Sequence, residues 1–370
     1  MNHPARRAAH PSAAYRGLAE LDVGDLEVLR LILRGDSVID WRRLHFREPA
    51  EVDRFLRLEL FDLADPRDEA RMRAILAQAV EYLRSAFGYK VAAPVAQPED
   101  LRRLFLLASG APEPSRYRRI ACVVLKCMHV IHHLEARELL FRTPLRESDL
   151  ADRVDRRVMA VARQMLDEGI PIVEFQGNRK SRSSLMTKLL VKRESVAAQV
   201  FDRVRYRVVT RAPGDVAPVL RHLFQVLFPF NYVVPGQSDN SLLPFRRMVG
   251  EHPRADEIAA HLQDPLELEV GKPRRQNPFS EDSYRALHFV VDLPVRIDDI
   301  LPVEAPVDAE DLGRVVFSMV EFQVMDWETA RQNEEGPASH PRYKKRQNLT
   351  ALRRLSRGLV VPKRKRKKPA

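Results

Sequence analysis

The chain has 370 residues, of which 45% are hydrophobic, a composition typical of a globular protein with a substantial buried core. Its first twenty residues contain no continuous apolar stretch, and no later run is long enough to cross a bilayer, so we expect no export signal, no membrane span and a cytoplasmic location. The net charge of +11 is concentrated near the end. Residues 344–370 contain twelve Lys or Arg and no acid, which leaves residues 1–343 at 11 − 12 = −1.

The first part of the chain predicts helices. We expect residues 1–14 to be disordered and residues 15–147 to form an all-helical N-terminal region. The reason is that segments such as DLEVLRLIL and ARMRAILAQAVEYLRSAF repeat apolar residues at helical spacing. The sequence has no strand-rich unit in this part.

One predicted helix, IACVVLKCMHVIHHLEARELLF, contains both cysteines of the chain. Cys122 and Cys127 are five residues apart within it, which excludes a disulfide framework. His129 and His133 are four apart, a spacing that could hold a metal ion. Because the cysteines do not share one helical face and no second ligand cluster follows, a packed core helix is favoured over a metal site.

From residue 148 the pattern changes to alternating strands and helices. Ser148 is placed to cap a helix that Gly169 ends. We predict an α+β fold in which a mixed sheet of about five strands is flanked by helices, with an insertion at about 237–280. The expected strands are 170–175, 206–210, 231–234, 286–293 and 315–324, and the expected helices are 183–194 and 215–228.

Two acids lie on predicted neighbouring strands. Asp202 begins DRVRYRVV and Glu321 lies in VEFQV, so together they could hold Mg²⁺, which prefers a few carboxylate oxygens and completes its shell with water and phosphate. Gln323 is two residues beyond Glu321 and therefore shares its face of the strand. Taken alone, each of the two acids is more often a carboxylate exposed to solvent on a strand than a metal ligand.

Two further segments contain groups suited to a nucleotide. GNRKSRSSLMTK supplies Arg179, Lys180, Arg182 and Lys188 near a helix start, where cations and the helix dipole suit a polyphosphate. SYRALHF places Tyr284 before a strand, where its ring could stack on a base. A solvated basic helix start and simple packing are the alternatives for these two segments.

The order of these motifs resembles the synthetase domain of the RelA/SpoT family, the enzymes that make the alarmone guanosine tetraphosphate. The resemblance extends from Ser148 to Lys344, and VEFQV and the stretch that follows it align without a gap to GPASHPRYK. It implies a nucleotidyltransferase-like synthetase fold for residues 148–344. It also implies transfer of pyrophosphate from ATP to the ribose 3′-hydroxyl of GDP or GTP, with Mg²⁺.

The resemblance also implies a role for each matching residue. Asp202 would be the metal ligand, and Glu321 a second metal contact that helps to remove the 3′-hydroxyl proton. Arg179 is adjacent to the position that packs on adenine. The expected donor-phosphate contacts are Lys180, Ser184 and Lys188, with Arg207 matching the arginine after the metal-binding aspartate, and the expected acceptor contacts are Tyr284, His288 and Gln323.

Several positions depart from the family pattern. Asn178 replaces the arginine that packs on adenine, and the sequence leaves open whether Arg179 takes over that role. These departures favour a shifted acceptor or a lost activity over an efficient GDP pyrophosphokinase. The other replaced positions are Ser280, Asp282, Met325, Ala330 and Pro341.

Two classes of function follow from these residues. One is an alarmone-type pyrophosphokinase whose acceptor is a nucleotide or, as in some small family members, a transfer RNA 3′ end. The alternative is a catalytically degenerate regulatory protein that binds a nucleotide or RNA. Retention of Asp202 and Glu321 favours the enzyme. Residues 1–147 contain no His-Asp dipeptide, so we expect no alarmone hydrolase.

The basic end of the chain suggests a second partner. We expect residues 345–370 to be a basic tail, disordered in isolation because like charges repel. Residues 344–370 could contact RNA or a ribosome through phosphates. A purely solubilising extension is the alternative.

Overall fold

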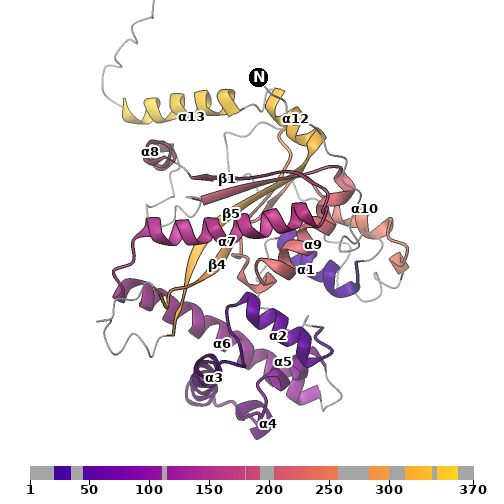
Figure 1. Ribbon diagram of the computed structural model, residues 1–370, viewed down its shortest axis with the longest axis vertical. Coiled ribbons are helices and arrows are strands. Elements are labelled where there is room, and N and C mark those ends of the chain that lie inside the picture. The colour runs from indigo at the N-terminus through magenta and orange to yellow at the C-terminus, as the bar shows by residue number, and fades with distance from the viewer. Residues whose placement is uncertain are drawn as a thin grey trace, which may run out of the picture.

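The computed structural model describes residues 21–34, 45–110, 115–179, 181–191, 204–256, 283–299, 313–335 and 340–356. These residues form an elongated molecule with a mixed β-sheet in the middle. Helices α2 to α6 lie at one end, and α8, α12 and α13 lie at the other (Figure 1). Within the described ranges, the helices are all too short or too polar to span a membrane.

The sheet has five strands in the order β1-β2-β5-β4-β3, as the sequence predicts for the fold class. Strands β2 and β5 are parallel, and the other neighbouring pairs are antiparallel. The strand bounds are β1 Ile172–Arg179, β2 Val204–Thr210, β3 Asp239–Asn240, β4 Leu287–Arg296 and β5 Val315–Asp326.

One of the expected strands is wrong. Residues 230–232 form a 3₁₀ helix, η5 (Phe230–Tyr232), and only Val233 makes an isolated bridge, to Val291. The fifth strand is instead β3, inside the segment expected to be an insertion. The turn at η5 directs Tyr232 into the interior, where it is 2% exposed.

One face of the sheet is covered by α7 (Glu147–Asp167) and α9 (Val216–Val226) and forms the larger core. Alternate residues of the central strands point to this face, among them Tyr206, Phe322 and Phe289. The rings of Phe289 and Phe322 stack with centroids 5.4 Å apart. Helix α1 (Val23–Arg34) also contributes to this core, so it packs with the sheet.

Gly177 on β1 is required by the packing of α7. The hydroxyl of Tyr206 donates a hydrogen bond to Asp155 of α7 at 2.9 Å. A Cβ at Gly177 would lie 2.9 Å from the ring of Tyr206 and 3.1 Å from the Asp155 carboxylate. Glycine therefore allows β1, β2 and α7 to meet at this point.

Helix α7 ends where the sequence predicts but begins differently. Gly169 has a φ of 73°, the left-handed conformation that ends many helices. Ser148 is not the cap, because the N-cap residue is Arg146 and no side chain caps it. The Ser148 hydroxyl instead donates to the neighbouring Asp149 at 3.2 Å.

The helices at the N-terminal end form a second core of their own. Its long helices, α3 and α6, are joined by α2 and α5 around apolar residues such as Leu76 and Leu125. The bounds are α2 Pro49–Leu58, α3 Pro66–Phe87, α4 Ala93–Ala96, α5 Arg102–Ser109 and α6 Ser115–Arg142. Cys122 is buried in this core, as expected for a packed helix.

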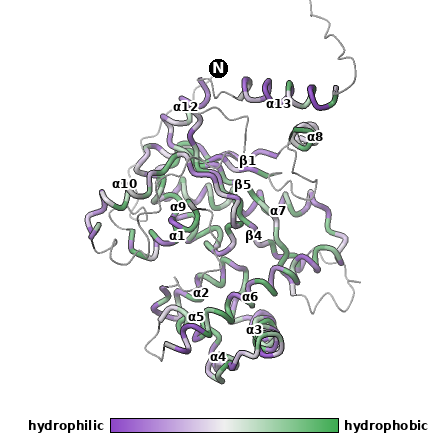
Figure 2. Tube along the Cα trace, turned by 180° about the vertical axis from the view of Figure 1, so that it is seen from behind, coloured by the Kyte–Doolittle hydropathy of each residue, from purple (hydrophilic) through white to green (hydrophobic). Residues whose placement is uncertain are grey.

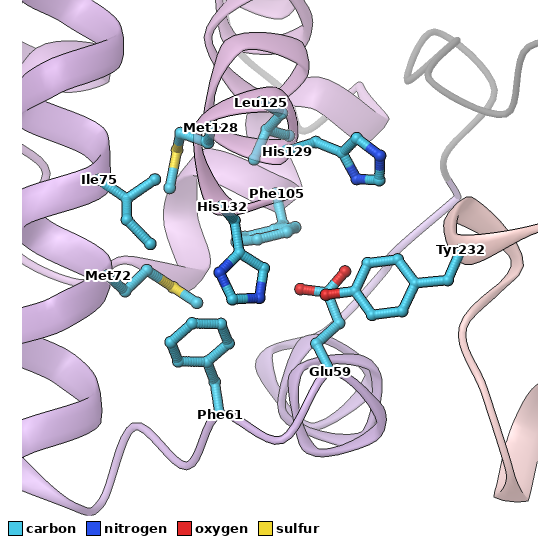
Figure 3. A pocket seen from close by; sticks show the side chains of 10 residues that line it. All are labelled: Glu59, Phe61, Met72, Ile75, Phe105, Leu125, Met128, His129, His132 and Tyr232. Carbon is cyan, nitrogen blue, oxygen red and sulfur yellow. The ribbon is translucent and has the colours of Figure 1, made fainter. Parts of the chain in front are cut away.

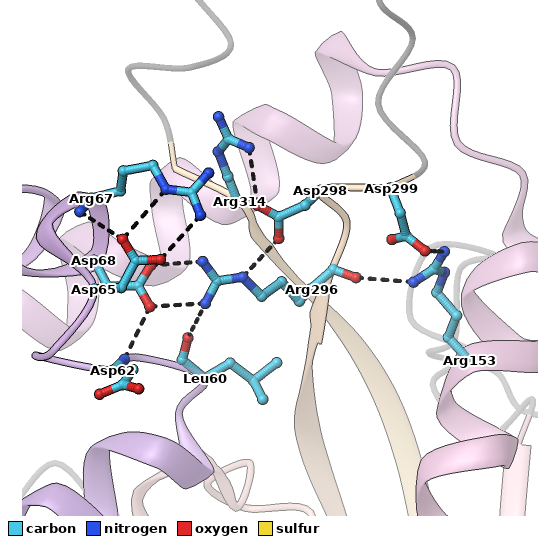
Figure 4. Close-up of polar contacts among 10 residues, drawn as sticks. All are labelled: Leu60, Asp62, Asp65, Arg67, Asp68, Arg153, Arg296, Asp298, Asp299 and Arg314. Carbon is cyan, nitrogen blue, oxygen red and sulfur yellow. Dashed lines mark hydrogen bonds and ion pairs between the residues drawn. The ribbon is translucent and has the colours of Figure 1, made fainter.

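The helical region is fastened to the sheet by an ion cluster around Arg296, at the end of β4 (Figure 4). Its guanidinium group donates to both carboxylate oxygens of Asp68 at 2.8 Å and to the carbonyl oxygen of Leu60 at 3.0 Å. Arg296 also pairs with Asp298 at 2.7 Å. A bidentate pair of this kind fixes orientation as well as distance.

The other end of the molecule holds α8 (Arg182–Val191), α12 (Trp327–Glu335) and α13 (His340–Leu355), while the short α10 (Phe245–Gly250) lies nearer the middle. Helix α13 lies beside α8, and Figure 2 shows this pair from behind, far from α3 and α4. Arg354 donates to the carbonyl oxygen of Leu190 at 2.6 Å. Helix α13 runs across position 345, where we expected the tail to begin, and residues 357–370 lie outside the described residues.

Candidate active site

The second face of the sheet is polar near the carboxyl end of β5. Register places Arg205 of β2 beside Glu321 of β5 and Arg207 beside Gln323. His288 of β4 is paired with Gln323 on the other side. Directly paired residues point to the same face. This polar face therefore unites four of the residues expected from the sequence, Glu321, Gln323, His288 and Arg207.

The carboxylate of Glu321 is the centre of this arrangement. Its Oε2 accepts a hydrogen bond from Nε of Arg205 at 3.1 Å, and its Oε1 lies 3.2 Å from Nδ1 of His288. The side chain is only 12% exposed. Arg205 was not among the residues expected from the sequence, although its position two residues before Arg207 places both on one strand face.

A chain of hydrogen bonds connects this carboxylate to Tyr284. The amide nitrogen of Gln323 donates to the Tyr284 hydroxyl, which in turn lies 3.1 Å from Nε2 of His288. If Tyr284 donates to Nε2, the neutral imidazole carries its proton on Nδ1 and donates to Glu321. One tautomer of His288 therefore satisfies every member of the chain.

Two consequences for the acceptor residues follow. Burial raises the pKa of Tyr284 to about 12, so its hydroxyl remains a protonated donor at neutral pH. The amide of Gln323, which we expected to be available to a ribose or phosphate, is instead bonded to that hydroxyl. In this arrangement Gln323 positions the tyrosine ring.

Arg207 lies next along the polar face, toward α12. It pairs with Glu334 at 2.6 Å and with Glu174 of β1 at 3.4 Å. Its guanidinium group therefore bridges a sheet strand and a helix. The expected contact with donor phosphates would compete with these two carboxylates.

The β1 residues near the expected donor site point in opposite directions. Asn178 is paired with Arg205 and so lies on the polar face. Arg179 lies on the other face, where it pairs with Asp152 of α7 at 2.6 Å. Arg179 is therefore not brought to the polar face, because alternate strand residues point to opposite sides.

The remaining donor residues are only partly placed. Ser184 lies in the first turn of α8, where its backbone nitrogen and its hydroxyl are both within 3.4 Å of the Ser181 hydroxyl. Lys188 belongs to α8, but the position of its side chain is not described. Asp202, Lys180, Ser280 and Asp282 lie outside the described residues.

Two of the replaced positions, one on β5 and one on α12, are buried where α12 packs on the sheet. Met325 and Ala330 are each 2% exposed and form a small apolar cluster with Val209 and Ala286. The amide nitrogen of Asn333 on α12 lies 3.7 Å from the sulfur of Met325. The same side chain accepts from the backbone nitrogen of Arg285 at 3.2 Å and donates to its carbonyl oxygen at 2.7 Å. Asn333 thereby fixes the backbone next to Tyr284, a role that no sequence motif indicated.

A second carboxyl group borders the polar face at β3. Asp239 is paired with His288, and burial raises its pKa while the neighbouring imidazole opposes the shift. It places a second carboxyl group on the side where Tyr284 and His288 lie. No sequence motif indicated this residue, because a two-residue strand has no recognisable pattern.

The residues present are compatible with a magnesium ion. Within the described ranges no cluster of three or more His, Cys, Asp or Glu side chains could hold a metal. Mg²⁺ usually takes only one or two protein carboxylates and completes its shell with water and substrate phosphate. Of the two expected ligands the structure describes Glu321, which can supply one carboxylate; Asp202 lies outside the described residues, so the pair stays a prediction.

Similar proteins are found among solved structures only. No protein-family model matches the sequence, and a search of curated proteins finds no match. The small alarmone synthetase 2 of Bacillus subtilis matches with 17% identity and a TM-score of 0.31, over 58% of this chain and 85% of that chain.

Two further solved structures are similar over comparable lengths. The small alarmone synthetase 1 of Bacillus subtilis, bound to its product pppGpp, matches with 14% identity and a TM-score of 0.28, over 65% of this chain and 92% of that chain. A GTP pyrophosphokinase family protein of Streptococcus pneumoniae matches with 15% identity and a TM-score of 0.25, over 56% and 88% of the two chains. The solved structures that this chain resembles thus include small alarmone synthetases.

Proposed function

We propose that the chain transfers pyrophosphate from ATP to the 3′-hydroxyl of a nucleotide, with magnesium. The observation that carries this proposal is the hydrogen-bonded chain Gln323–Tyr284–His288–Glu321 on the polar face. It joins a carboxylate to an aromatic ring, the two groups that would act on the hydroxyl and the base of one acceptor. The sequence motifs that resemble the RelA/SpoT synthetase domain supply these same residues.

Each residue has a task that its environment supports. The Tyr284 ring, held at its hydroxyl, would stack on the acceptor base. The Glu321 carboxylate would accept the proton of the attacking 3′-hydroxyl, since His288 orients it. Asp202 and Glu321 would hold Mg²⁺, which would neutralise charge on the donor phosphates.

Arg205 sets a condition for this chemistry. Its guanidinium group pairs with one oxygen of Glu321, and a cation beside a carboxylate weakens that carboxylate as a base. Binding of ATP with magnesium would draw Arg205 toward the phosphates and release this oxygen. Positioning and charge neutralisation of this kind contribute most of the catalysis in phosphoryl-type transfer.

The test is the release of AMP. Purified chain, ATP and magnesium are incubated with a panel of acceptors that includes GDP, GTP, other nucleotides and transfer RNA. The proposal expects AMP together with a pyrophosphorylated acceptor for at least one member, and loss of both in Glu321→Gln. If no acceptor yields AMP, the enzymatic proposal is wrong.

A non-catalytic nucleotide binder is the second candidate, and a specific observation favours it. Both carboxylate oxygens of Glu321 are already occupied, by Arg205 and His288. Positions 325 and 330, where the related motifs have an arginine and a histidine, are here buried apolar residues. Nucleotide binding measured by calorimetry without any AMP release would select this candidate.

We also propose that the basic end of the chain contacts RNA, including ribosomal RNA. Support comes from α13, whose exposed cations lie at the end of the molecule far from the helical region (Figure 1). The exposed cations are Arg342, Lys345, Arg353 and Arg354. Deletion of residues 363–368 is expected to weaken RNA binding and reduce its salt dependence. Unchanged affinity would contradict this role.

A further inference from the structure

A glutamate, 8% exposed, lies buried where the helical region meets the sheet. Glu59 directly follows α2 and faces η5 and α6. Its Oε1 accepts a hydrogen bond of 2.7 Å from the side-chain amide of Asn231. Figure 3 shows its carboxyl group beside the hydroxyl of Tyr232, with the ring of His132 nearby. Glu59 therefore lies at the end of α2, bonds to η5, and lines a pocket together with residues of α6.

No described cation compensates this carboxyl group. Arg157, the buried arginine of the same junction, donates instead to the carbonyl oxygens of Leu227 and Pro294 at 2.8 Å and of Leu58 at 3.3 Å. A carboxylate removed from water without a cation is strongly disfavoured, so it takes up a proton. Accordingly, burial raises the pKa of Glu59 to about 8, although Asn231 and Tyr232 oppose the shift.

Across the junction from Glu59, helix α6 carries three histidines. His132 is 9% exposed, and its Nε2 has no hydrogen-bond partner among the described residues. His129 lies 3.4 Å from the Asn231 amide, and His133 stacks on Phe317 of β5 with centroids 4.1 Å apart. Burial lowers the pKa of His132 to about 3 and that of His129 well below its usual value. These two rings are neutral at neutral pH.

A small cavity makes proton exchange at this junction feasible. Its volume is about 30 Å³, enough for one or two water molecules, and Glu59, His129, His132 and Tyr232 are part of its lining. The Oδ1 atom of Asn231 also lacks a hydrogen-bond partner within the described ranges. Polar atoms without partners around a cavity of this size are suited to bind water.

We propose that Glu59, His129, His132, Asn231 and Tyr232, here named the seam cluster, form a proton-controlled latch between the helical region and the sheet. The helices α2 to α6 stay docked while the seam cluster is uncharged. They loosen when Glu59 loses its proton or a histidine gains one. This inference concerns the docking of two parts of the chain and does not depend on the proposed function.

Other charged groups surround the seam cluster, and most of them are paired with groups outside it. His133 pairs with Asp292 of β4 at 3.2 Å, and Arg71 of α3, which is paired with Glu135 of α6, faces His132. Arg157 of α7 is held by three carbonyl oxygens. Arg71 disfavours protonation of His132, so it reinforces the neutral state.

The sign of the pH dependence follows from the two pKa shifts. Glu59 has a pKa of about 8 when docked and an ordinary value of 4.5 when exposed. Between these values only the undocked form is ionised, so docking weakens as the pH rises from 4.5 to 8. For His129 and His132 the docked pKa is lowered from 6.5, so docking weakens as the pH falls below 6.5. Docking should be strongest near pH 6.5.

The latch shares two strands with the candidate active site. Asp292 and Phe317, which contact His133, lie four residues from His288 and Glu321 on the same faces of β4 and β5. Four residues of a strand span about 13 Å. A change in the packing of α6 therefore alters contacts with the two strands that carry His288 and Glu321.

The test is amide hydrogen exchange of the full chain as a function of pH. The protection of α2 and α6 amides, corrected for intrinsic exchange, is expected to fall about fourfold between pH 6.5 and 8. Glu59 alone would lower it about 16-fold, and the loss of protons from the two histidines of the undocked form offsets about fourfold of this. Glu59→Gln, which imitates the protonated acid, should abolish this fall. Glu48→Gln, an exposed glutamate immediately before α2, should retain it. An equal fall in Glu59→Gln, or none in the unaltered chain, would overturn the proposal.

Infrared spectroscopy of the unaltered chain tests the proposal without relying on the folding of Glu59→Gln. Infrared spectra of the unaltered chain at pH 7 should contain the carbonyl band of a protonated carboxylic acid, which disappears as the pH is raised above 8. Absence of this band at pH 7 would also overturn the proposal. His132→Gln should weaken the loss of amide protection below pH 6.5. If the loss of protection below pH 6.5 is unchanged in this variant, protonation of His132 does not contribute to undocking.

Discussion

The imidazole of His288 joins two different groups, with Nδ1 3.2 Å from the carboxylate of Glu321 and Nε2 3.1 Å from the hydroxyl of Tyr284. One ring on β4 therefore orients both a carboxylate on β5 and an aromatic side chain at the strand entrance. The distance between a base and a stacking platform is fixed by this contact. The predictions for the site depend on that geometry.

Two substitutions should distinguish the role of the Tyr284 ring from the role of its hydroxyl. Tyr284→Leu removes the platform, and we expect the acceptor KM to rise about tenfold or more because base stacking contributes about 1–3 kcal/mol. Tyr284→Phe retains the ring but releases His288 and Gln323, so kcat should fall more than the acceptor KM rises. Steady-state kinetics with the acceptor found in the AMP panel measure both. Equal KM values for Leu and Phe would contradict stacking.

Asn333 should stabilise the segment that carries Tyr284. Asn333→Ala removes two part-buried hydrogen bonds to the backbone of Arg285, and at about 0.5–1.5 kcal/mol for each bond the loss should be about 1–3 kcal/mol. Denaturant unfolding measures this loss. Gln332→Ala on the exposed side of α12, where the amide bonds only Glu328, is the matched control and should change stability little. Equal stabilities of the two variants would exclude the positioning role.

The ion cluster at Arg296 should stabilise docking of the helical region. Asp68→Asn breaks the bidentate pair, and because Asp68 is only 7% exposed the loss should be about 1.5–3 kcal/mol. Asp65→Asn, at an exposed pair with Arg67 and able to retain the helix cap, should have little effect. The measurement is the urea midpoint of unfolding, and two similar midpoints would contradict this account.

Gly177 should tolerate no side chain. Gly177→Ala forces a methyl group against Tyr206 and Asp155 at about 3 Å, and overpacking of this kind costs about 1–3 kcal/mol. Gly214→Ala is the control, because no atom lies within 4 Å of its Cβ position. Calorimetric melting compares the two. A lower melting temperature for Gly214→Ala than for Gly177→Ala would be contrary to the packing described.

Most of the fold could be predicted because its elements have strong periodicity. The strands around 206–210, 286–293 and 315–324 and the helices α7 and α9 are long and regular, and the motifs on them brought Glu321, Gln323 and His288 to one face. The elements that were missed depend on tertiary contacts. Strand β3 has two residues, and η5 is stabilised by burial of Tyr232 and not by local pattern.

Errors about single residues have equally physical causes. Strand β1 extends to Arg179, four residues beyond the predicted end, and only this extension shows that Asn178 and Arg179 face opposite sides. Glu59 gave no signal, since an acid after a helix usually lies in solvent. The roles of Asp202, Lys180 and Lys188 stay predictions.

The most direct test of the central claim is AMP release with the full acceptor panel, measured side by side for the unaltered chain, Glu321→Gln and Glu328→Gln. Glu328 is an exposed glutamate of α12, bonded to Gln332. The proposed function predicts AMP and a pyrophosphorylated acceptor for the unaltered chain and Glu328→Gln, and a loss of at least about 100-fold in Glu321→Gln. AMP release that is equal in all three proteins, or absent in all three, would contradict it.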